Sequence, residues 1–218
     1  MYKAIKTVLD KVLAFFGIVF LFFPLMLVAL AIKIDSPGPA FFRQERVGMN
    51  EKRFKVFKFR TMKRTDVVFD IDHPVIGNDN ENLTRVGKVI RRLKIDEFLQ
   101  LINVLIGDMS LIGPRPLMPV YLERYEEWEK EKFTVKPGMS GLSQIRGNGH
   151  LSSVERSFYD VVYTRNVSFS MDVEILFKTL GVVVFGEEKY LRHVDPAAIA
   201  EMRGKRDESR DKNADVGA

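Results

Sequence analysis

The sequence predicts an α+β protein that is mostly helical, with an N-terminal re-entrant membrane helix, a short β-hairpin and interfacial amphipathic helices. Three observations support this fold class. An uncharged apolar run of 21 residues covers 12–32, which is long enough for a membrane helix. Apolar and basic residues nearly alternate over 53–60, as in a half-buried strand. Apolar residues then recur with the helical period over 83–106 and 153–185.

The composition excludes several classes of site. The chain has 218 residues, of which 46% are hydrophobic and 29% charged, so we expect one domain, or one domain with an appendage. It has no cysteine, which excludes disulfides and thiolate metal sites, and its three histidines lack the spacing of a zinc site. The net charge of +5 favours anionic partners such as phospholipid, nucleotide or nucleic acid.

Positive charge on both sides of the apolar run favours a helix that enters and leaves the same face of the membrane. Residues 1–11 carry three positive charges, and residues 33–64 carry ten positive and three negative charges. Positive flanks favour the cytoplasmic side, and Pro24 within the run would allow a bend. A straight single span and a buried soluble helix remain as alternatives. The chain then divides into a re-entrant helix at 1–34, a domain at the cytoplasmic face at 35–200 and a disordered tail at 201–218.

The segment after the apolar run predicts a β-hairpin with a basic second strand. Residues 41–42 begin the first strand, residues 48–50 make the turn, and residues 53–60 form the second strand. The lysines of the second strand either face solvent or form a basic strip that faces phosphates or lipid head groups. Residues 63–82 are polar and rich in turn formers, which predicts a loop.

Two short helices are expected next to each other after this loop. The first covers 83–93 with Thr84 as its cap. The second begins near Ile95 or Asp96 and ends at Gly107.

Three more helices are expected in the second half of the chain. Residues 121–132 alternate in charge, which predicts a helix with a solvated face. Residues 153–165 and 172–185 also have helical patterns. The apolar side of the last helix either packs in the core or lies in the membrane interface.

The adjacent acids Asp96 and Glu97 are the candidate reacting groups. Neighbours on a helix point about 100° apart, so the pair would not share a proton. At a helix N-terminus both carboxylates would stay ionised, and an ionised carboxylate can attack phosphorus or bind Mg²⁺. The simpler interpretation is that Asp96 only caps the helix. Arg91 on one side and Arg115, in a stiff Gly-Pro-Arg-Pro turn, on the other would neutralise phosphate charge. The chain has no P-loop and no dinucleotide fingerprint.

Four segments together resemble a known family. They are the apolar run with Pro24, FKVFKFRTM at 54–62, IDEFLQLINVLIGDMSLIGPRP at 95–116 and KPGMSGLSQ at 136–144. Over nearly the whole chain, to about residue 185, the sequence is similar to the small monotopic phosphoglycosyl transferases of the bacterial sugar transferase family. The resemblance implies a re-entrant helix in one leaflet and an active site at the cytoplasmic face of the bacterial inner membrane. It also implies that a carboxylate attacks the β-phosphate of a UDP-sugar, releases UMP and then passes the phospho-sugar to polyprenol phosphate.

The resemblance also implies a role for particular residues. Asp96 matches the nucleophile, and Glu97 matches the partner acid that would help Asp96 to hold Mg²⁺. The residues expected around the substrate are Lys58, Arg91, Arg115, Gln144, Arg146 and, with the least defined role, Asp172. Two positions depart from the family pattern. Phe23 replaces a serine often found before the bending proline, and Asn148 replaces an arginine for which Arg146 would substitute.

The partners implied are a UDP-sugar, polyprenol phosphate and membrane phospholipids, without nucleic acid, and a homodimer is allowed. The product would be a polyprenol diphosphate-sugar, formed in the first membrane step of glycoconjugate assembly. Two other functions compete with this one. A non-catalytic, membrane-anchored basic protein that binds anionic lipid or nucleic acid would not need Asp96. A structural membrane scaffold for a glycan-assembly complex would not need it either.

Overall fold

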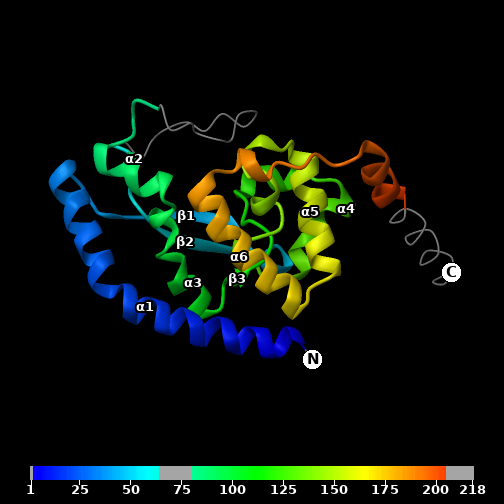
Figure 1. Ribbon diagram of the computed structural model, residues 1–218, viewed down its shortest axis with the longest axis horizontal. Coiled ribbons are helices and arrows are strands. Elements are labelled where there is room, and N and C mark those ends of the chain that lie inside the picture. Colours follow the sequence, from blue (N-terminus) through cyan, green and yellow to red (C-terminus); the bar gives the residue numbers. More distant parts are fainter. Residues whose placement is uncertain (1, 64–79, 205–218) are drawn as a thin grey trace.

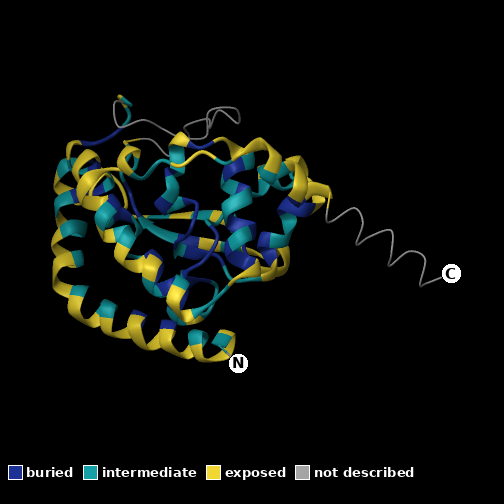
Figure 2. Ribbon diagram, turned by 45° about the vertical axis from the view of Figure 1, so that its right-hand side comes forward, coloured by how far each residue is buried: buried dark blue, intermediate teal, exposed yellow. Residues whose placement is uncertain are grey.

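The computed structural model describes residues 2–63 and 80–204. Its first element is the long helix α1, Tyr2–Asp35, which contains Pro24 and bends around the rest of the molecule (Figure 1). The most apolar stretch of α1 has a mean hydropathy of 2.8, so among the described residues this helix is the one long and apolar enough to cross a membrane. Most of its side chains are exposed (Figure 2). The prediction of a long apolar N-terminal helix is confirmed.

The predicted β-hairpin is present. Strand β1, Phe41–Val47, pairs antiparallel with β2, Arg53–Phe59, so that Phe41 lies opposite Phe59 and Val47 opposite Arg53. The turn between the strands contains Asn50 in the left-handed conformation, with a φ of 56°. Asparagine tolerates that conformation better than most residues, which explains its place in the turn. Val56 and Phe59 of β2 are buried on opposite faces of the hairpin, Val56 against Leu101 of α3 and Phe59 in a cluster with Ile32 of α1.

Two short helices follow the residues that the structure leaves undescribed. Helix α2, Arg85–Arg92, is capped as predicted by Thr84, whose Oγ1 accepts a hydrogen bond of 2.8 Å from the amide of Gly87. A 3₁₀ turn, Ile95–Glu97, comes next, and helix α3, Gln100–Ile106, begins only after it. Helix α3 ends at Gly107, whose φ of 101° makes it the expected left-handed cap. The predicted loop at 63–82 lies almost entirely outside the described residues.

Helix α1 packs lengthwise on α3 and on the hairpin. Ala14 is fully buried in a cluster with Val56 and Leu101. A Cβ atom on Gly17 would lie 3.2 Å from Leu101 Cδ1, so the glycine lets the two helices approach closely. Farther along α1, Ile32 is buried in a second cluster with residues of the hairpin and of α2.

Both ends of α1 are bonded to the domain that follows it. Near its start, Lys6 Nζ lies 2.8 Å from Asp172 Oδ2 of helix α6, and Ser110 Oγ donates to Asp10 Oδ2 at 2.6 Å. At its end, the buried guanidinium of Arg60 donates to the two carbonyl oxygens that follow the helix, at 2.8 and 2.7 Å. The two ends of the apolar helix are therefore fixed to the same body.

A small parallel sheet holds the loops of the second half together. Strand β3, Ser110–Ile112, pairs with β4, Gly138–Ser140. Helix α5, Ser153–Arg165, and helix α6, Phe169–Phe185, pack against it. The sequence predicted both helices, although α6 begins before residue 172.

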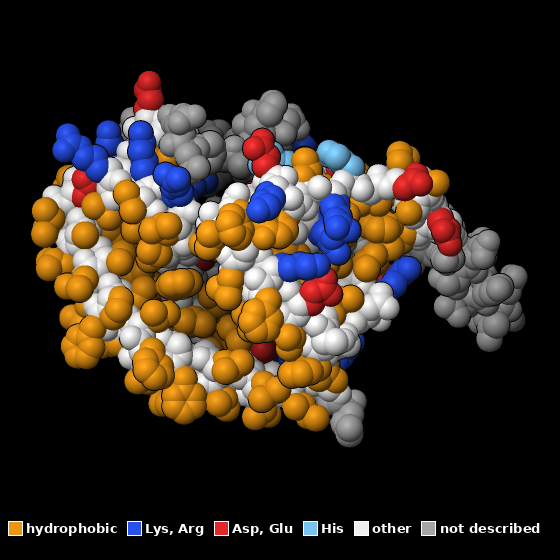
Figure 3. All heavy atoms as spheres, viewed as in Figure 1, with side chains coloured by type: hydrophobic (Ala, Val, Ile, Leu, Met, Phe, Trp, Pro, Cys, Tyr) orange, Lys and Arg blue, Asp and Glu red, His pale blue; other side chains and the backbone are white. Residues whose placement is uncertain are grey.

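Helix α6 has two apolar sides. Ile175 and Val182 are buried in the core with Tyr163 of α5. Leu176, Phe177, Leu180 and Val184 are exposed. The apolar side recognised in the sequence is therefore the outer side, and Figure 3 shows the apolar side chains of α1 and α6 gathered on one face of the molecule.

The charged segment 121–132 differs from its prediction. It forms a 3₁₀ turn, Pro119–Arg124, the short helix α4, Glu127–Lys130, and a second 3₁₀ turn, Glu131–Thr134. Trp128 and Lys132 are buried, because this segment packs between α5 and Met202 of the C-terminal region. The predicted solvated face is therefore wrong for this part. Residues 196–204 are helical, so the tail expected to be disordered from 201 starts as the end of a helix.

Candidate active site

The adjacent acids lie on the 3₁₀ turn between α2 and α3. Lys94 precedes the turn with a φ of 58°, and this left-handed residue breaks α2 from the turn. Asp96 is only 8% exposed, and its Oδ1 atom is buried without a partner among the described residues. It lies inside the turn, and the N-cap positions of the turn and of α3 are occupied by Lys94 and Leu99. The interpretation of Asp96 as a simple helix cap is therefore wrong. A buried carboxylate oxygen without a donor is costly, and it is a feature typical of a site that receives a ligand.

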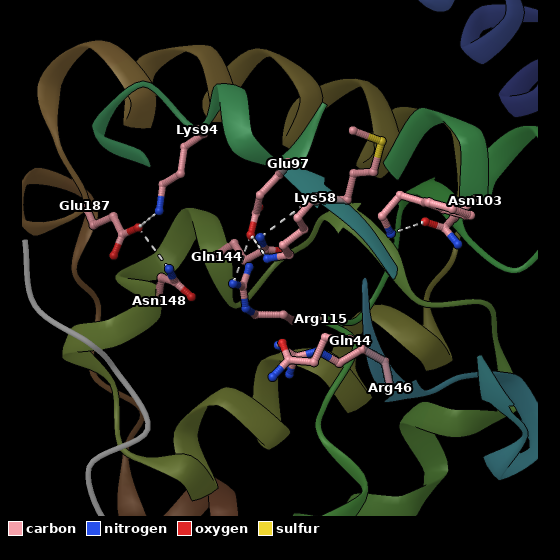
Figure 4. Close-up of polar contacts among 12 residues, drawn as sticks. Gln44, Arg46, Lys58, Lys94, Glu97, Asn103, Arg115, Gln144, Asn148 and Glu187 are labelled. Carbon is pink, nitrogen blue, oxygen red and sulfur yellow. Dashed lines mark hydrogen bonds and ion pairs between the residues drawn. The ribbon is translucent and has the colours of Figure 1, made fainter. Parts of the chain in front are cut away.

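Glu97 is held by two cations that the sequence analysis predicted near it. Lys58 Nζ lies 2.6 Å from Glu97 Oε1, and Arg115 Nη2 lies 3.3 Å from the same oxygen. Figure 4 shows the lysine and the arginine converging on this carboxylate from different parts of the chain. The hairpin, the 3₁₀ turn and the Gly-Pro-Arg-Pro turn thus meet at Glu97.

The buried side chain of Asn103 positions Lys58. Asn103 Oδ1 accepts a hydrogen bond of 3.0 Å from the amide of Phe57, and Asn103 Nδ2 donates to the carbonyl of Lys55 at 2.9 Å. The amide side chain thus pairs with the edge of β2 as a neighbouring strand would. These hydrogen bonds hold β2 against α3 at Phe57, one residue before Lys58. No pattern in the sequence indicated this role, because Asn103 is a single polar residue between the apolar residues of a helix.

The glycine-rich segment positions Arg115. The amide of Gly113 donates to the carbonyl of Ser140 at 2.8 Å, and the amide of Gly138 donates to the carbonyl of Pro114 at 2.8 Å. A Cβ atom on Gly138 would lie 2.1 Å from the nitrogen of Gly113, so only glycine allows this backbone contact. We expected these glycines to let a ligand approach. Instead, they let the backbone pair with the turn that carries Arg115.

The two carboxyl groups have opposite pKa shifts. Burial, followed by the negative charge of Glu97, raises the pKa of Asp96 despite the cations Lys58 and Arg91 nearby. Burial also acts to raise the pKa of Glu97, but Lys58 and Arg115 lower it overall to well below its ordinary value. Glu97 is therefore the permanent anion of the pair. Asp96, by contrast, keeps one oxygen without a partner among the described residues, and the nearby cations do not offset the cost of its burial.

A third acid, Glu187, lies beside the turn and was not predicted. Its Oε1 atom is 2.9 Å from Lys94 Nζ and accepts a hydrogen bond of 2.9 Å from Asn148 Nδ2 (Figure 4). Glu187 follows α6 and therefore bonds the end of that helix to the residue that starts the acidic turn. Asn148, which we left out of the site as a departure from the family pattern, contacts the site through this acid.

Arg46 is a further cation that the sequence analysis missed. It shares a pocket with Lys58, Glu97 and Arg115, and its Nη2 atom donates to Gln44 Oε1 at 2.5 Å. Burial is the main cause that lowers the pKa of Arg46 to about 10, so it stays charged at neutral pH. The hairpin register places Arg46 on the same face as Lys58, and this was the signal that could have identified it.

The other predicted residues differ in their positions. Arg91, which was expected near the substrate phosphates, lies close enough to Asp96 to interact with it electrostatically. Gln144 donates to the carbonyl of Met139 at 3.2 Å, and its Oε1 atom is buried without a partner among the described residues. Arg146 lies on the next 3₁₀ turn, Gln144–Arg146, and has a buried Nε atom that likewise lacks a described partner.

Asp172 is not brought to this cluster. Its Oδ1 atom accepts a hydrogen bond of 2.7 Å from Tyr163 Oη, and its Oδ2 atom contacts Tyr2 Oη at 2.5 Å and Lys6 Nζ at 2.8 Å. These contacts join α6 to the start of α1. A substrate-binding role implied by the resemblance alone has no support in this arrangement.

Comparison with known proteins identifies the family. A sequence model described as bacterial sugar transferase matches residues 1–186. The chain belongs to the bacterial sugar transferase family. Glu187 follows the last matched residue directly, which explains why the resemblance did not point to it.

Several similar proteins have names that specify undecaprenyl phosphate as a substrate. A UDP-N-acetylgalactosamine-undecaprenyl-phosphate N-acetylgalactosaminephosphotransferase of Aeromonas hydrophila is 38% identical, over 85% of this chain and 45% of its own length. The UDP-glucose:undecaprenyl-phosphate glucose-1-phosphate transferase of Caulobacter vibrioides is 39% identical, over 85% of this chain and 72% of its own. The Escherichia coli protein of the same name is 38% identical, over 82% of this chain and 40% of its own. The chain thus spans less than half of two of these relatives and most of the third.

Proposed function

We propose that this sugar transferase moves a phospho-sugar from a UDP-sugar to polyprenol phosphate. The observation that carries the proposal is the buried, unpartnered oxygen of Asp96, beside a carboxylate that two cations already neutralise. An anionic nucleophile can approach an anionic diphosphate only where cations offset the repulsion. The cations in reach of Asp96 include Lys58, Arg91 and Lys94. The names of the relatives agree with this chemistry.

In the first step, an Asp96 oxygen attacks the β-phosphorus of the UDP-sugar. A bond from this oxygen to phosphorus forms, the bond from phosphorus to the bridging oxygen breaks, and UMP leaves with that oxygen and its electron pair. The phospho-sugar then stays on Asp96 as an acyl phosphate. In the second step, a phosphate oxygen of the polyprenol phosphate attacks the same phosphorus. This releases polyprenol diphosphate-sugar and restores the Asp96 carboxylate.

The neighbours of Asp96 orient the substrate and balance its charge. Arg115 and Lys58 are held by Glu97 on one side of the acid pair, and Arg91 acts from α2. Because Glu97 keeps both partners in place before the substrate arrives, little reorganisation is needed as charge moves toward the leaving group. In this proposal Glu97 therefore positions cations as well as contributing its own charge.

The donor set of the pair suits Mg²⁺. Among residues 2–63 and 80–204, no three acidic, histidine or cysteine side chains form a complete metal site. Mg²⁺ commonly binds one or two carboxylates and completes its shell with substrate phosphate oxygens and water. Within the described part of the chain, Asp96 Oδ1 has no hydrogen-bond partner and both cation contacts of Glu97 use Oε1, so each acid has an oxygen left for such an ion. A bound Mg²⁺ would neutralise charge on the diphosphate.

The attachments of α1 support a re-entrant helix in one leaflet. A straight span would place Lys6 across the membrane from the domain that contains Asp172, yet these side chains form an ion pair of 2.8 Å. The exposed apolar side of α6 would lie in the interface beside α1. This arrangement brings a lipid acceptor and a water-soluble UDP-sugar to one site at the cytoplasmic face of the inner membrane.

Intact mass measurement tests the reaction. The purified chain is incubated with Mg²⁺ and each of a panel of UDP-sugars, and both UMP release and protein mass are followed. We expect UMP release and a phospho-sugar adduct with at least one donor, and a loss of at least about 10³-fold in Asp96→Asn. The control variant Glu174→Gln changes an exposed acid on α6 and keeps full activity. If Asp96→Asn retains activity, Asp96 is not the nucleophile and the proposed mechanism fails. If no donor releases UMP, the protein is a non-catalytic binder or scaffold.

Cysteine labelling tests the membrane arrangement, because the chain has no cysteine of its own. Single cysteines replace Lys3, before the apolar run, and Glu188, after α6. In intact cells a membrane-impermeant maleimide should label neither variant, and after permeabilisation it should label both. Labelling of the Lys3→Cys variant in intact cells would instead establish a straight span.

A further inference from the structure

Arg46 occupies the part of the site that lies away from Asp96. It lines a pocket together with Lys58, Glu97 and Arg115, and Asp96 is not among the described residues of that lining. Figure 4 shows Glu97 between two groups, with Lys94 and Glu187 on one side and the Arg46–Gln44 pair on the other. The site therefore has two ends, one near Asp96 and one near Arg46.

The electrostatic interactions of Asp96 and of Arg46 agree with this arrangement of the site. Asp96 interacts most strongly with Glu97, Lys58, Arg91 and Lys94. Arg46 interacts with Arg115, Glu97 and Tyr121. Glu97 is common to both groups, so it lies between the nucleophile and the distal arginine.

The distal end has groups that suit a second phosphate. Arg46, Lys58 and Arg115 surround the pocket, and Glu97 is the one acid in its lining, which leaves a positive excess. Gln44 occupies one terminal nitrogen of Arg46. The hydroxyl of Tyr121 is buried and has no hydrogen-bond partner among the described residues. A guanidinium and an unpartnered hydroxyl are donors that a phosphate accepts.

We propose that Arg46, together with Tyr121, binds the α-phosphate of the leaving nucleoside monophosphate. The inference rests on the proposed function, because it takes the nucleophile to be Asp96 and the leaving group to be UMP. In phosphoryl transfer, the entering and leaving oxygens lie roughly in line on opposite sides of phosphorus. A β-phosphorus next to Asp96 therefore directs its leaving oxygen, and the α-phosphate attached to it, toward the end that contains Arg46.

This position gives Arg46 a function in one half-reaction only. As the bond from the β-phosphorus to the bridging oxygen breaks, that oxygen takes the electron pair and negative charge grows on the α-phosphate. Arg46 stabilises this charge during the attack of Asp96, and equally when UMP attacks the adduct in the reverse direction. The transfer from the adduct to polyprenol phosphate contains no α-phosphate of UMP, so Arg46 does not act in it.

The test measures three rates in detergent with Mg²⁺ for the wild type and Arg46→Gln. These are adduct formation from the UDP-sugar, decay of the isolated adduct with UMP, and decay of the isolated adduct with polyprenol phosphate. A slow variant is loaded by long incubation and then desalted. We expect the first two rates to fall by about 10- to 100-fold and the third to change by less than about threefold. Tyr121→Phe should slow the same two rates by a smaller factor.

Matched variants keep the test decisive. Arg43→Gln removes an arginine from the other face of the same strand, where its guanidinium lies 4.7 Å from the centre of the Phe57 ring, and should change none of the three rates. Arg46→Lys retains a charge without the planar fork and should recover part of the loss. Equal losses in all three rates, or no loss in any, overturn the role of Arg46 while the proposed function stands. If the wild type forms no adduct, both fail.

Discussion

Two buried aspartates in this protein have the same exposure and opposite surroundings. Asp96 and Asp172 are each 8% exposed. Both oxygens of Asp172 accept hydrogen bonds or ion pairs, from Tyr163 on one side and from Tyr2 and Lys6 on the other. Asp96 keeps one oxygen without a partner among the described residues. Burial of a carboxylate therefore does not distinguish a structural group from a reacting one, whereas the completeness of its hydrogen bonds does.

The charge around each aspartate differs in the same sense. Lys6 stands between Asp10 and Asp172, so the cluster at the start of α1 has more acid than base. Around Asp96 and Glu97, the cations Lys58, Arg91, Lys94 and Arg115 outnumber the acids. The first cluster is complete and joins two helices. The second cluster has an excess of positive charge, which an anionic ligand would neutralise.

The largest effect on stability is expected from Asp172→Ala. The change leaves the charge of Lys6 and the hydroxyls of Tyr2 and Tyr163 without their acceptor in a buried position. Removing one partner of a buried ion pair costs about 3 kcal/mol or more, so we expect the Tm in detergent to fall by about 6–12 °C. The rate of UMP release per folded molecule should stay within about threefold of the wild type.

Glu174→Gln on the same helix is the control for Asp172→Ala. Glu174 pairs with Lys178 on the surface, and such pairs contribute less than about 1 kcal/mol. An Asp172→Ala variant that kept its Tm but lost UMP release would return Asp172 to the active site, as the family resemblance implies. The two aspartates would then belong to one functional unit.

Lys132 and Asp160 are two further buried ionisable residues. They test whether hydrogen bonding is enough to make the charged form of a buried group favourable. Ser143 Oγ donates to Asp160 at 2.7 Å, and Lys132 Nζ donates to Ser157 Oγ at 3.0 Å. Burial is nevertheless the main cause that raises the pKa of Asp160 to about 6 and the main cause that lowers the pKa of Lys132 to about 8. In each case the folded protein favours the neutral form.

The sign of the pH dependence follows from these shifts. Between about pH 4 and pH 6 folded Asp160 binds more proton than the unfolded chain, so stability falls as pH rises. Between about pH 8 and pH 10 folded Lys132 has lost its proton while the unfolded chain keeps it, so stability rises again. Each change amounts to about 3 kcal/mol at most. The Tm is measured as a function of pH for the wild type and for the double variant Asp160→Asn/Lys132→Met. The difference between the two curves should show both slopes, and a difference that does not vary with pH would contradict the prediction.

Local patterns predicted the elements that depend on local chemistry. The cap at Thr84, the stop at Gly107 and the hairpin turn near Asn50 all follow from residue types that favour one backbone conformation. The family resemblance then placed Lys58, Glu97 and Arg115 in one site, and the structure brings these three together.

Contacts between distant segments could not be predicted in this way. Asn103 was missed because its partners are backbone groups of a strand 46 and 48 residues away. Segment 121–132 was misread because its alternating charges do not reveal that α5 covers Lys132. Asp172 was expected near the substrate because its position matched a family pattern, whereas its contacts are with α1 and α5. Each case concerns a polar side chain whose contacts cannot be identified from local sequence patterns.

The smallest predicted effect concerns Glu187, which lies between the end of α6 and the turn that contains Asp96. It accepts hydrogen bonds from Lys94 and Asn148, and it bonds the end of α6 to the residue that precedes the acidic turn. Glu187→Gln weakens the contact with Lys94 and allows the acidic turn more freedom. We expect kcat for UMP release to fall about tenfold, with KM for the UDP-sugar changed by less than about twofold, because a hydrogen bond to a charged group contributes about 1.5 kcal/mol.

A double-mutant cycle separates this positioning role from a general loss of stability. Lys94→Gln should reduce kcat as Glu187→Gln does, and the double variant should be no worse than either, since both changes remove the same contact. Glu188→Gln, at the exposed neighbouring position, should leave kcat unchanged. Additive losses in the double variant would mean that each residue acts separately. Glu187 would then belong with Asp172 among the groups that stabilise the fold and not among those that place the reacting carboxylate.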